Sequence, residues 1–237
     1  MIQDNPAARL LSLIENGKKL DLGTNCRVAW QELLNVEDNE SLLMSRLGKV
    51  MELPELTIQA LQDNFPSQRD SWTYWSTQVN SGFKAQNIND NWATFINHID
   101  SHSINYLRSS ADLLQTKSSV KILDDETLRD IREKLNTIYL EIAESSLADE
   151  VKVYLVRKLR QLISSIDEYK IIGVAALLNS IDSTIGHAYL NPEYKNFLRD
   201  TELGKKLLDT LASMANVVTV AVGLPQLTFA LAPLLGS

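Results

Sequence analysis

Three histidines are the residues of this chain best suited to chemistry. His98 and His102 are four residues apart, so they share one face if the segment around them is helical. Such a pair can bind a metal ion when a third ligand comes from elsewhere, and His187 or Asp182 would supply it. No HExxH motif accompanies the pair. The sequence therefore offers a metal site as one alternative and ordinary polar contacts as the other, and it specifies no cofactor.

Two single residues carry weaker chemical signals. His187 follows a Ser-Thr-Ile-Gly turn and could act as a lone general base, but no nucleophile neighbours it in a recognisable pattern. Cys26 precedes Arg27, and a nearby cation favours the thiolate form of a cysteine. Cys26 is the single cysteine, so the chain forms no internal disulfide, which is typical of a reducing compartment.

A group of cations forms a further candidate. Arg157, Lys158 and Arg160 lie close together on one expected helix, with the two arginines on its solvent side. They suit a phosphate or an anionic lipid head group. Acidic residues near both ends of the same helix dilute their charge, which favours a solvated helix face as the alternative.

No sequence motif fixes a reaction. Walker A, GxGxxG, nucleophile-elbow, CxxC and calcium-loop patterns are all absent from the sequence. The net charge is −7 at pH 7 and neither half of the chain is basic, so nucleic acid is not an expected partner. These features favour a protein that is not an enzyme.

Hydrophobic spacing predicts an all-α fold. Apolar residues recur every three or four positions, and no window keeps the alternation of a β-strand. We expect an array or bundle of about 9–11 helices, with one helix ending at Pro54, a loop over 80–91 and a long helix over 91–115. A linker at residues 116–124 suggests three parts: an N-terminal helical subdomain (1–116), a long-helix bundle (117–209) and an apolar tail (210–237).

Two tryptophans in the N-terminal part are a candidate partner surface. Trp72, Trp75 and Val79 have helical spacing and would share one helix face. An aromatic face of this kind is either core packing or an anchor for a partner.

The tail, residues 210–237, contains no charged side chain. As one helix, residues 211–235 would extend roughly 37 Å, which is enough for a hydrocarbon core of roughly 30 Å. Pro225 breaks that helix, and Asn216 and Gln226 are polar, which favours a buried core helix or an oligomer interface instead. The residues of this membrane or interface segment are Leu211, Val217, Val218, Val222, Leu224, Pro225, Leu227, Phe229, Leu231, Leu234 and Leu235.

These features lead to three functional hypotheses. The first is a cytoplasmic, non-enzymatic helical protein whose tail inserts in or anchors to a membrane, as a toxin-like or defence effector would. The second is a soluble α-helical protein–protein interaction module, or a self-associating protein, whose tail is buried in the core or in an oligomer interface. The third is a helical enzyme or metal protein that uses His98, His102 and His187.

Overall fold

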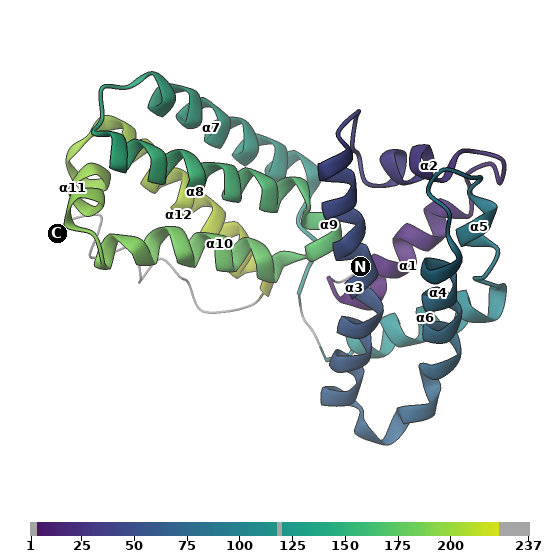
Figure 1. Cartoon of the computed structure of the whole chain (residues 1–237). Coiled ribbons are helices and arrows are strands. Elements are labelled where there is room, and N and C mark those ends of the chain that lie inside the picture. Colours follow the sequence, from purple (N-terminus) through teal and green to yellow (C-terminus); the bar gives the residue numbers. More distant parts are fainter. Residues whose placement is uncertain (1–3, 118–119, 223–237) are drawn as a thin grey trace. The chain divides into compact units, whose positions relative to one another are not determined.

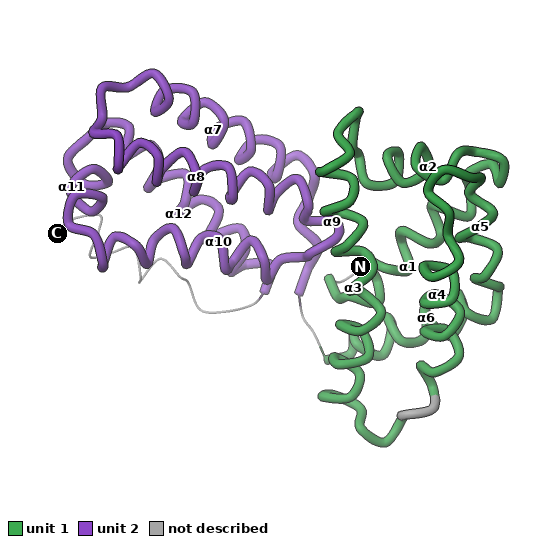
Figure 2. The backbone as a smooth tube through the Cα atoms, viewed as in Figure 1, with its two compact units in different colours: residues 1–119 green, residues 120–237 purple. Residues whose placement is uncertain are grey.

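The structure, a computed structural model, describes residues 4–117 and 120–222, apart from the side chains of residues 69 and 70. Within these ranges the chain forms twelve α-helices, two 3₁₀ helices and no β-strand (Figure 1). Two of the twelve, α5 (Ala93–Ile96) and α9 (Tyr169–Ile172), are only four residues long. The predicted all-α fold is therefore confirmed. The chain divides into two compact units, unit 1 (residues 1–119) and unit 2 (residues 120–237), as Figure 2 shows.

Unit 1 packs helices of different lengths around an aromatic core. Helix α1 lies against α3 and α6, and α4 lies against α6 and α5. All four tryptophans of the chain are in this core, and none is more than 5% exposed. The remaining elements of unit 1 are α1 (Pro6–Gly17), α2 (Cys26–Leu33), α3 (Glu40–Asn64), η1 (Pro66–Ser71), α4 (Thr73–Ala85) and α6 (Ser101–Gln115).

Asparagine and aspartate side chains begin the helices of unit 1. The Asn5 side chain accepts a hydrogen bond of 2.9 Å from the backbone N–H of Ala8. Asn39 accepts one of 3.0 Å from Leu42, and Asn25 caps α2 in the same way. Each side chain satisfies a backbone N–H that has no partner within its own helix. These caps fix where each helix begins.

Three boundaries in unit 1 differ from the prediction, and one of them is a break between α5 and α6 within the expected helix over 91–115. Pro54 lies inside α3, which is continuous from Glu40 to Asn64. Proline removes one backbone donor from a helix, but Leu53, Pro54 and Thr57 are all buried, and this packing outweighs the lost hydrogen bond. Helix α4 continues to Ala85, so residues 80–85 of the expected loop are helical.

Unit 2 is a four-helix bundle with short connecting helices. Helix α7 packs against α8, α8 against α10, α10 against α12, and α12 against α7, which closes a ring of four helices. Buried leucine, isoleucine and valine side chains fill its centre. The elements other than α9 are α7 (Asp125–Glu144), α8 (Asp149–Asp167), α10 (Val174–Gly186), η2 (His187–Tyr189), α11 (Pro192–Asp200) and α12 (Glu202–Val222).

Helices α11 and α12 approach each other closely at a glycine. A Cβ atom on Gly204 would lie 1.9 Å from the carbonyl oxygen of Phe197, so only glycine fits between the two backbones.

Helix α12 starts at Glu202 and continues through residue 210 to Val222. The three-part division of the chain stays a prediction. No helix among residues 4–117 and 120–222 is both long and apolar enough to cross a bilayer.

Candidate functional site

The described part of the apolar tail, residues 210–222, is the C-terminal part of α12, and its apolar side chains lie on the inner face of that helix. Leu211 is 0% exposed and Val218 is 2% exposed, while Val217 and Val222 are partly buried against the same core. The opposite face of α12 consists of residues that are exposed to solvent: Asp209, Ser213, Asn216 and Val220. The other residues predicted for this segment lie outside the described residues: Leu224, Pro225, Leu227, Phe229, Leu231, Leu234 and Leu235.

Two threonines on the inner face of α12 show how the helix accommodates polar atoms in an apolar core. The Thr210 hydroxyl donates to the carbonyl oxygen of Lys206 at 2.8 Å, and the Thr219 hydroxyl donates to that of Asn216 at 3.0 Å. Both side chains are buried. Because their hydroxyls are satisfied within the helix itself, they do not require a partner from lipid or from another chain.

His98 and His102 do not share a helix. Helix α5 ends at Ile96 and α6 begins at Ser101, so His98 lies in the connection between them. Asp100 causes this break because its side chain accepts from the backbone N–H of Ser103 at 2.7 Å and caps α6. The expectation that the two histidines share a helix face is therefore wrong, and both are exposed.

The described residues contain no group of three histidine, cysteine or carboxylate side chains placed to hold a metal ion. His98 and His102 belong to unit 1, whereas His187 and Asp182 belong to unit 2. Local spacing suggested the metal site, and the structure does not bring its proposed ligands together in the part of the chain it describes.

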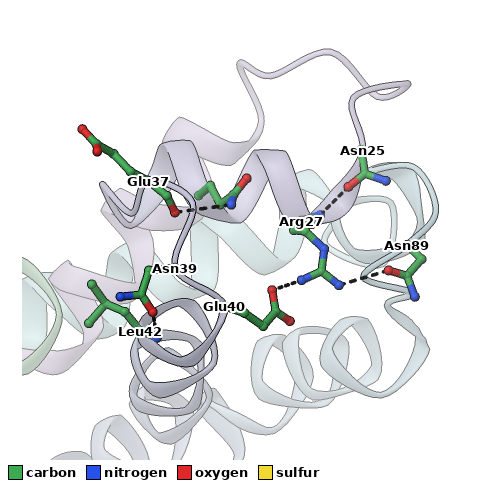
Figure 3. A network of polar contacts seen from close by, with 8 residues as sticks. Asn25, Arg27, Glu37, Asn39, Glu40, Leu42 and Asn89 are labelled. Carbon is green, nitrogen blue, oxygen red and sulfur yellow. Dashed lines mark hydrogen bonds and ion pairs between the residues drawn. The ribbon is translucent and has the colours of Figure 1, made fainter.

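Cys26 is buried at the start of α2. Burial raises the pKa of its thiol, although hydrogen bonds with Thr94 and Trp30 act in the opposite direction. The neighbouring Arg27 points elsewhere: Figure 3 shows its guanidinium paired with Glu40 and bonded to Asn89, the latter at 3.0 Å. The thiol is thus protonated and enclosed at neutral pH, which is unlike a reactive cysteine.

Trp72 and Trp75 lie in the core of unit 1 and do not form a surface. Trp72 is 5% exposed and Trp75 is 0% exposed. Trp72 is the N-cap residue of α4, and Trp75 lies in the first turn of that helix. Of the two interpretations of this pair, the structure favours core packing.

A cluster on unit 2 brings together several of the predicted cations and one histidine. The ring of His187 in η2 stacks on Tyr154 of α8, with centroids 3.9 Å apart and planes 20° apart. Tyr194 of α11 meets both rings, at 5.2 Å from Tyr154 and 5.4 Å from His187. The Arg157 guanidinium lies 5.6 Å and the Lys158 ammonium 5.8 Å from the Tyr154 ring centroid. We call these five residues the tyrosine–cation cluster.

The charges of the tyrosine–cation cluster act on one another. The pKa of His187 is lowered by burial and then by the charges of Lys158 and Arg157. The pKa of Lys158 is lowered by burial and by Arg157. Burial raises the pKa of Tyr154 to about 12. The cluster is therefore a positive site that contains neutral phenols and a histidine that resists protonation.

The predicted trio of cations separates on this surface. Lys158 donates to the Ser183 hydroxyl of α10 at 2.6 Å. Arg160 instead donates to the Tyr139 hydroxyl of α7 at 2.8 Å and lies 5.4 Å from that ring. Arg157 and Lys158 thus belong to the tyrosine–cation cluster, and Arg160 does not.

Sequence reasoning missed the two tyrosines. Tyr154 had a local signal, because it precedes Arg157 and Lys158 by three and four residues and so shares their helix face. Tyr194 had no such signal. It reaches the cluster from α11 only through the turn that η2 makes after α10.

A groove of about 590 Å³ lies between α7 and α12 on unit 2. Its charged lining is Asp130, Glu133, Lys134, Glu141, Lys206 and Asp209. Lys206 already pairs with Glu141 at 2.8 Å across the groove. Charges of both signs with an internal pair make this a solvated surface, and the tyrosine–cation cluster is the stronger candidate site.

The fold and these residues define an all-α protein made of two helical units, with an aromatic core in one and an aliphatic bundle in the other. No protein-family model, curated protein or solved structure matches the chain.

Proposed function

We propose that the chain is a non-enzymatic, soluble α-helical interaction module in which residues 210–222 belong to the core of unit 2. One observation supports this most strongly: α12 buries one face and exposes the other. The buried face contains Leu207, Leu211, Met214, Val218 and Ala221, none more than 4% exposed. A helix with one apolar and one polar face is typical of a bundle in water.

The partner in this proposal is a protein or a second copy of the chain, in a reducing compartment such as the cytoplasm. The buried thiol of Cys26 is consistent with that compartment. The net charge of −7 argues against nucleic acid.

Membrane insertion is a second candidate. It is supported by the uncharged sequence of residues 210–237 and by Val220, which is 66% exposed near the end of α12. A span that included residues 210–222 would first have to remove α12 from the bundle. That step would expose the apolar surfaces of α7 and α10, which pack against α12. Insertion therefore competes with the packing of unit 2.

Two substitutions in α12 distinguish these candidates. Leu211→Asp and Val220→Asp add the same charge to the same helix, but Leu211 is 0% exposed and Val220 is 66% exposed. If α12 is a core helix, Leu211→Asp unfolds unit 2, because losing the leucine alone costs about 2–5 kcal/mol and the buried carboxylate adds to that cost. Val220→Asp should leave the bundle folded.

The measurements are far-UV circular dichroism during heating and flotation with lipid vesicles. The core proposal expects a loss of helix in Leu211→Asp alone and no flotation of the unmodified chain. Membrane insertion expects the unmodified chain to float and both variants to float less. A Leu211→Asp chain with the stability of the unmodified protein would rule out a core role for α12.

A further inference from the structure

Two cations of the tyrosine–cation cluster lack a counter-ion. Several other arginines form ion pairs with carboxylates, among them Arg9, Arg27, Arg108, Arg132 and Arg199. Neither Arg157 nor Lys158 has a carboxylate partner among those residues, and both lie against the single ring of Tyr154. Two neighbouring cations without an acid raise the local positive potential, which attracts an anion.

The tyrosine–cation cluster also contains two buried hydroxyls, those of Tyr154 and Tyr194. Within the described ranges, neither the Tyr154 hydroxyl nor the Tyr194 hydroxyl has a hydrogen-bond partner. Tyr194 is 1% exposed. A buried polar atom without a partner costs about 1–3 kcal/mol, and such atoms are rare enough to need an explanation. Burial also raises the pKa of both phenols, so each keeps its proton and can donate it to the oxygen of an anion.

We propose that this surface of unit 2 binds a phosphate group, with Arg157 and Lys158 donating N–H groups to its oxygens and Tyr154 donating its hydroxyl. The planar fork of an arginine fits two phosphate oxygens, and the ammonium of a lysine supplies a second charge. Both side chains are long and lie against the Tyr154 ring, so they can turn toward an anion beside it. His187 stacks on the same ring and need not be charged for this binding.

The phosphate can come from two sources. One is a small molecule such as inorganic phosphate. The other is a lipid head group, which Tyr189 and Leu190 would favour: these residues lie two and three positions after His187 and are 57% and 82% exposed. The chemistry of recognition is the same in both cases, and the experiment separates them.

The first test compares Arg157→Gln with Arg160→Gln in the full chain. Both remove one positive charge from α8, but Arg160 lies with Tyr139 and outside the cluster. Binding of inorganic phosphate is measured by isothermal titration calorimetry at constant ionic strength. Arg157→Gln should weaken binding by about tenfold or more, because a hydrogen bond to a charged group contributes about 1.5–3 kcal/mol. Arg160→Gln should leave the affinity within about twofold of the unmodified chain, since it loses only screened charge.

The second test uses Tyr154→Phe, which removes a hydroxyl that has no partner. The melting temperature without phosphate should stay the same or rise, while phosphate affinity falls about fivefold. A purely structural role for this hydroxyl would lower the melting temperature instead.

The lipid source is tested with vesicles of phosphatidylcholine, with and without phosphatidic acid. Binding only to the phosphatidic acid vesicles, lost in Arg157→Gln and kept in Arg160→Gln, supports a head-group ligand. Binding of inorganic phosphate with the same pattern supports a small anion. The proposal is overturned if neither phosphate source binds, or if the two arginine variants weaken binding equally.

Discussion

Unit 1 and unit 2 are both built from helices, but different side chains hold them together. In unit 1, Trp30, Trp92 and Phe95 meet with ring centroids 5.0 Å apart in each pair. The core of unit 2 is mainly leucine, isoleucine and valine from four long helices. Rings and aliphatic side chains can both fill a core to the density of a protein interior, so the two units reach close packing with different residues.

The difference also appears in the hydrogen bonds of the two cores. Indole N–H groups need acceptors when they are buried. Trp30 donates to the Gln86 side chain at 2.9 Å, and Trp92 donates to the carbonyl oxygen of Gly17 at 2.8 Å. Two buried indoles of unit 1 thus form hydrogen bonds inside its aromatic core, whereas the buried Trp75 N–H has no partner among the described residues. The core of unit 2 follows mainly from apolar periodicity. Because every tryptophan is in unit 1, indole fluorescence reports on that unit alone.

The largest expected effects come from truncating one core residue in each unit. Trp92→Ala should lower the free energy of unfolding of unit 1 by about 3–5 kcal/mol, because it leaves a cavity and removes the hydrogen bond from the indole to the Gly17 carbonyl. Leu135→Ala, at a position that is 0% exposed in α7, should cost unit 2 about 2–5 kcal/mol. Chemical denaturation is followed by tryptophan fluorescence for unit 1 and by far-UV circular dichroism for both units.

Each variant is the control for the other. Trp92→Ala should shift the fluorescence transition and leave the part of the circular dichroism change that comes from unit 2 in place. Leu135→Ala should shift that part and leave the fluorescence transition in place. If either variant shifts both transitions together, the two units unfold as one, and the difference between their cores has no separate energetic meaning.

Two glycines give a smaller pair of effects with opposite signs. Gly204→Ala should destabilise unit 2 by about 1–3 kcal/mol or more, because its methyl group would overlap the backbone of α11 at Phe197. Gly48→Ala should stabilise unit 1 by about 0.5–1 kcal/mol, because Gly48 lies within α3 and a Cβ atom there has no neighbour within 4 Å. Thermal unfolding of both variants measures this. A stabilising Gly204→Ala would mean that α11 and α12 are not in close contact.

The sequence predicts the fold class and many helix ends because those depend on local chemistry. Asn5 and Pro6 begin α1, and Asn191 and Pro192 begin α11, at the positions that asparagine and proline favour at the start of a helix. The prediction that a helix ends at Pro54 is wrong because tertiary packing keeps this proline inside α3. The prediction of one helix across residues 97–100 is wrong because Asp100 caps α6. Tertiary packing is absent from any local window, whereas the cap at Asp100 was present in the sequence.

The candidate site was harder to predict than the fold. Residues 210–237 contain no charged side chain, so the tail by itself does not show a charged helix face. Asp209, Ser213, Asn216 and Val220 continue one helix face across that boundary, which shows that α12 has a solvent side. The tyrosine–cation cluster combines α8, η2 and α11. The sequence singled out His187 and the cations of α8, but nothing in it placed them together or added Tyr194.

The smallest expected effect concerns acid, which should weaken unit 2 before unit 1. His187 has a pKa below its ordinary value of 6.5 because of burial, Lys158 and Arg157. The unfolded chain therefore takes up this proton first, so the contribution of neutral His187 is complete above 6.5 and is lost as the pH falls through the folded pKa. In unit 1, the Tyr74 hydroxyl and then Ser103 lower the pKa of Asp100 from 3.8 to about 2. The contribution of ionised Asp100 to the stability of unit 1 is therefore complete above pH 3.8 and is lost only as the pH falls through about 2.

Thermal unfolding from neutral to acidic pH tests this order, with fluorescence for unit 1 and circular dichroism for both units. The circular dichroism transition of unit 2 should move to lower temperature below about pH 6.5, while the fluorescence transition changes later. His187→Gln cannot titrate, so it should reduce the shift of unit 2 in that range. Tyr74→Phe should raise the pKa of Asp100 and leave unit 2 unchanged, because the Tyr74 hydroxyl donates to Asp100 at 2.6 Å. An unaltered acid response of unit 2 in His187→Gln would show that the cluster does not resist protonation, and the contrast between the two units would then rest on their cores alone.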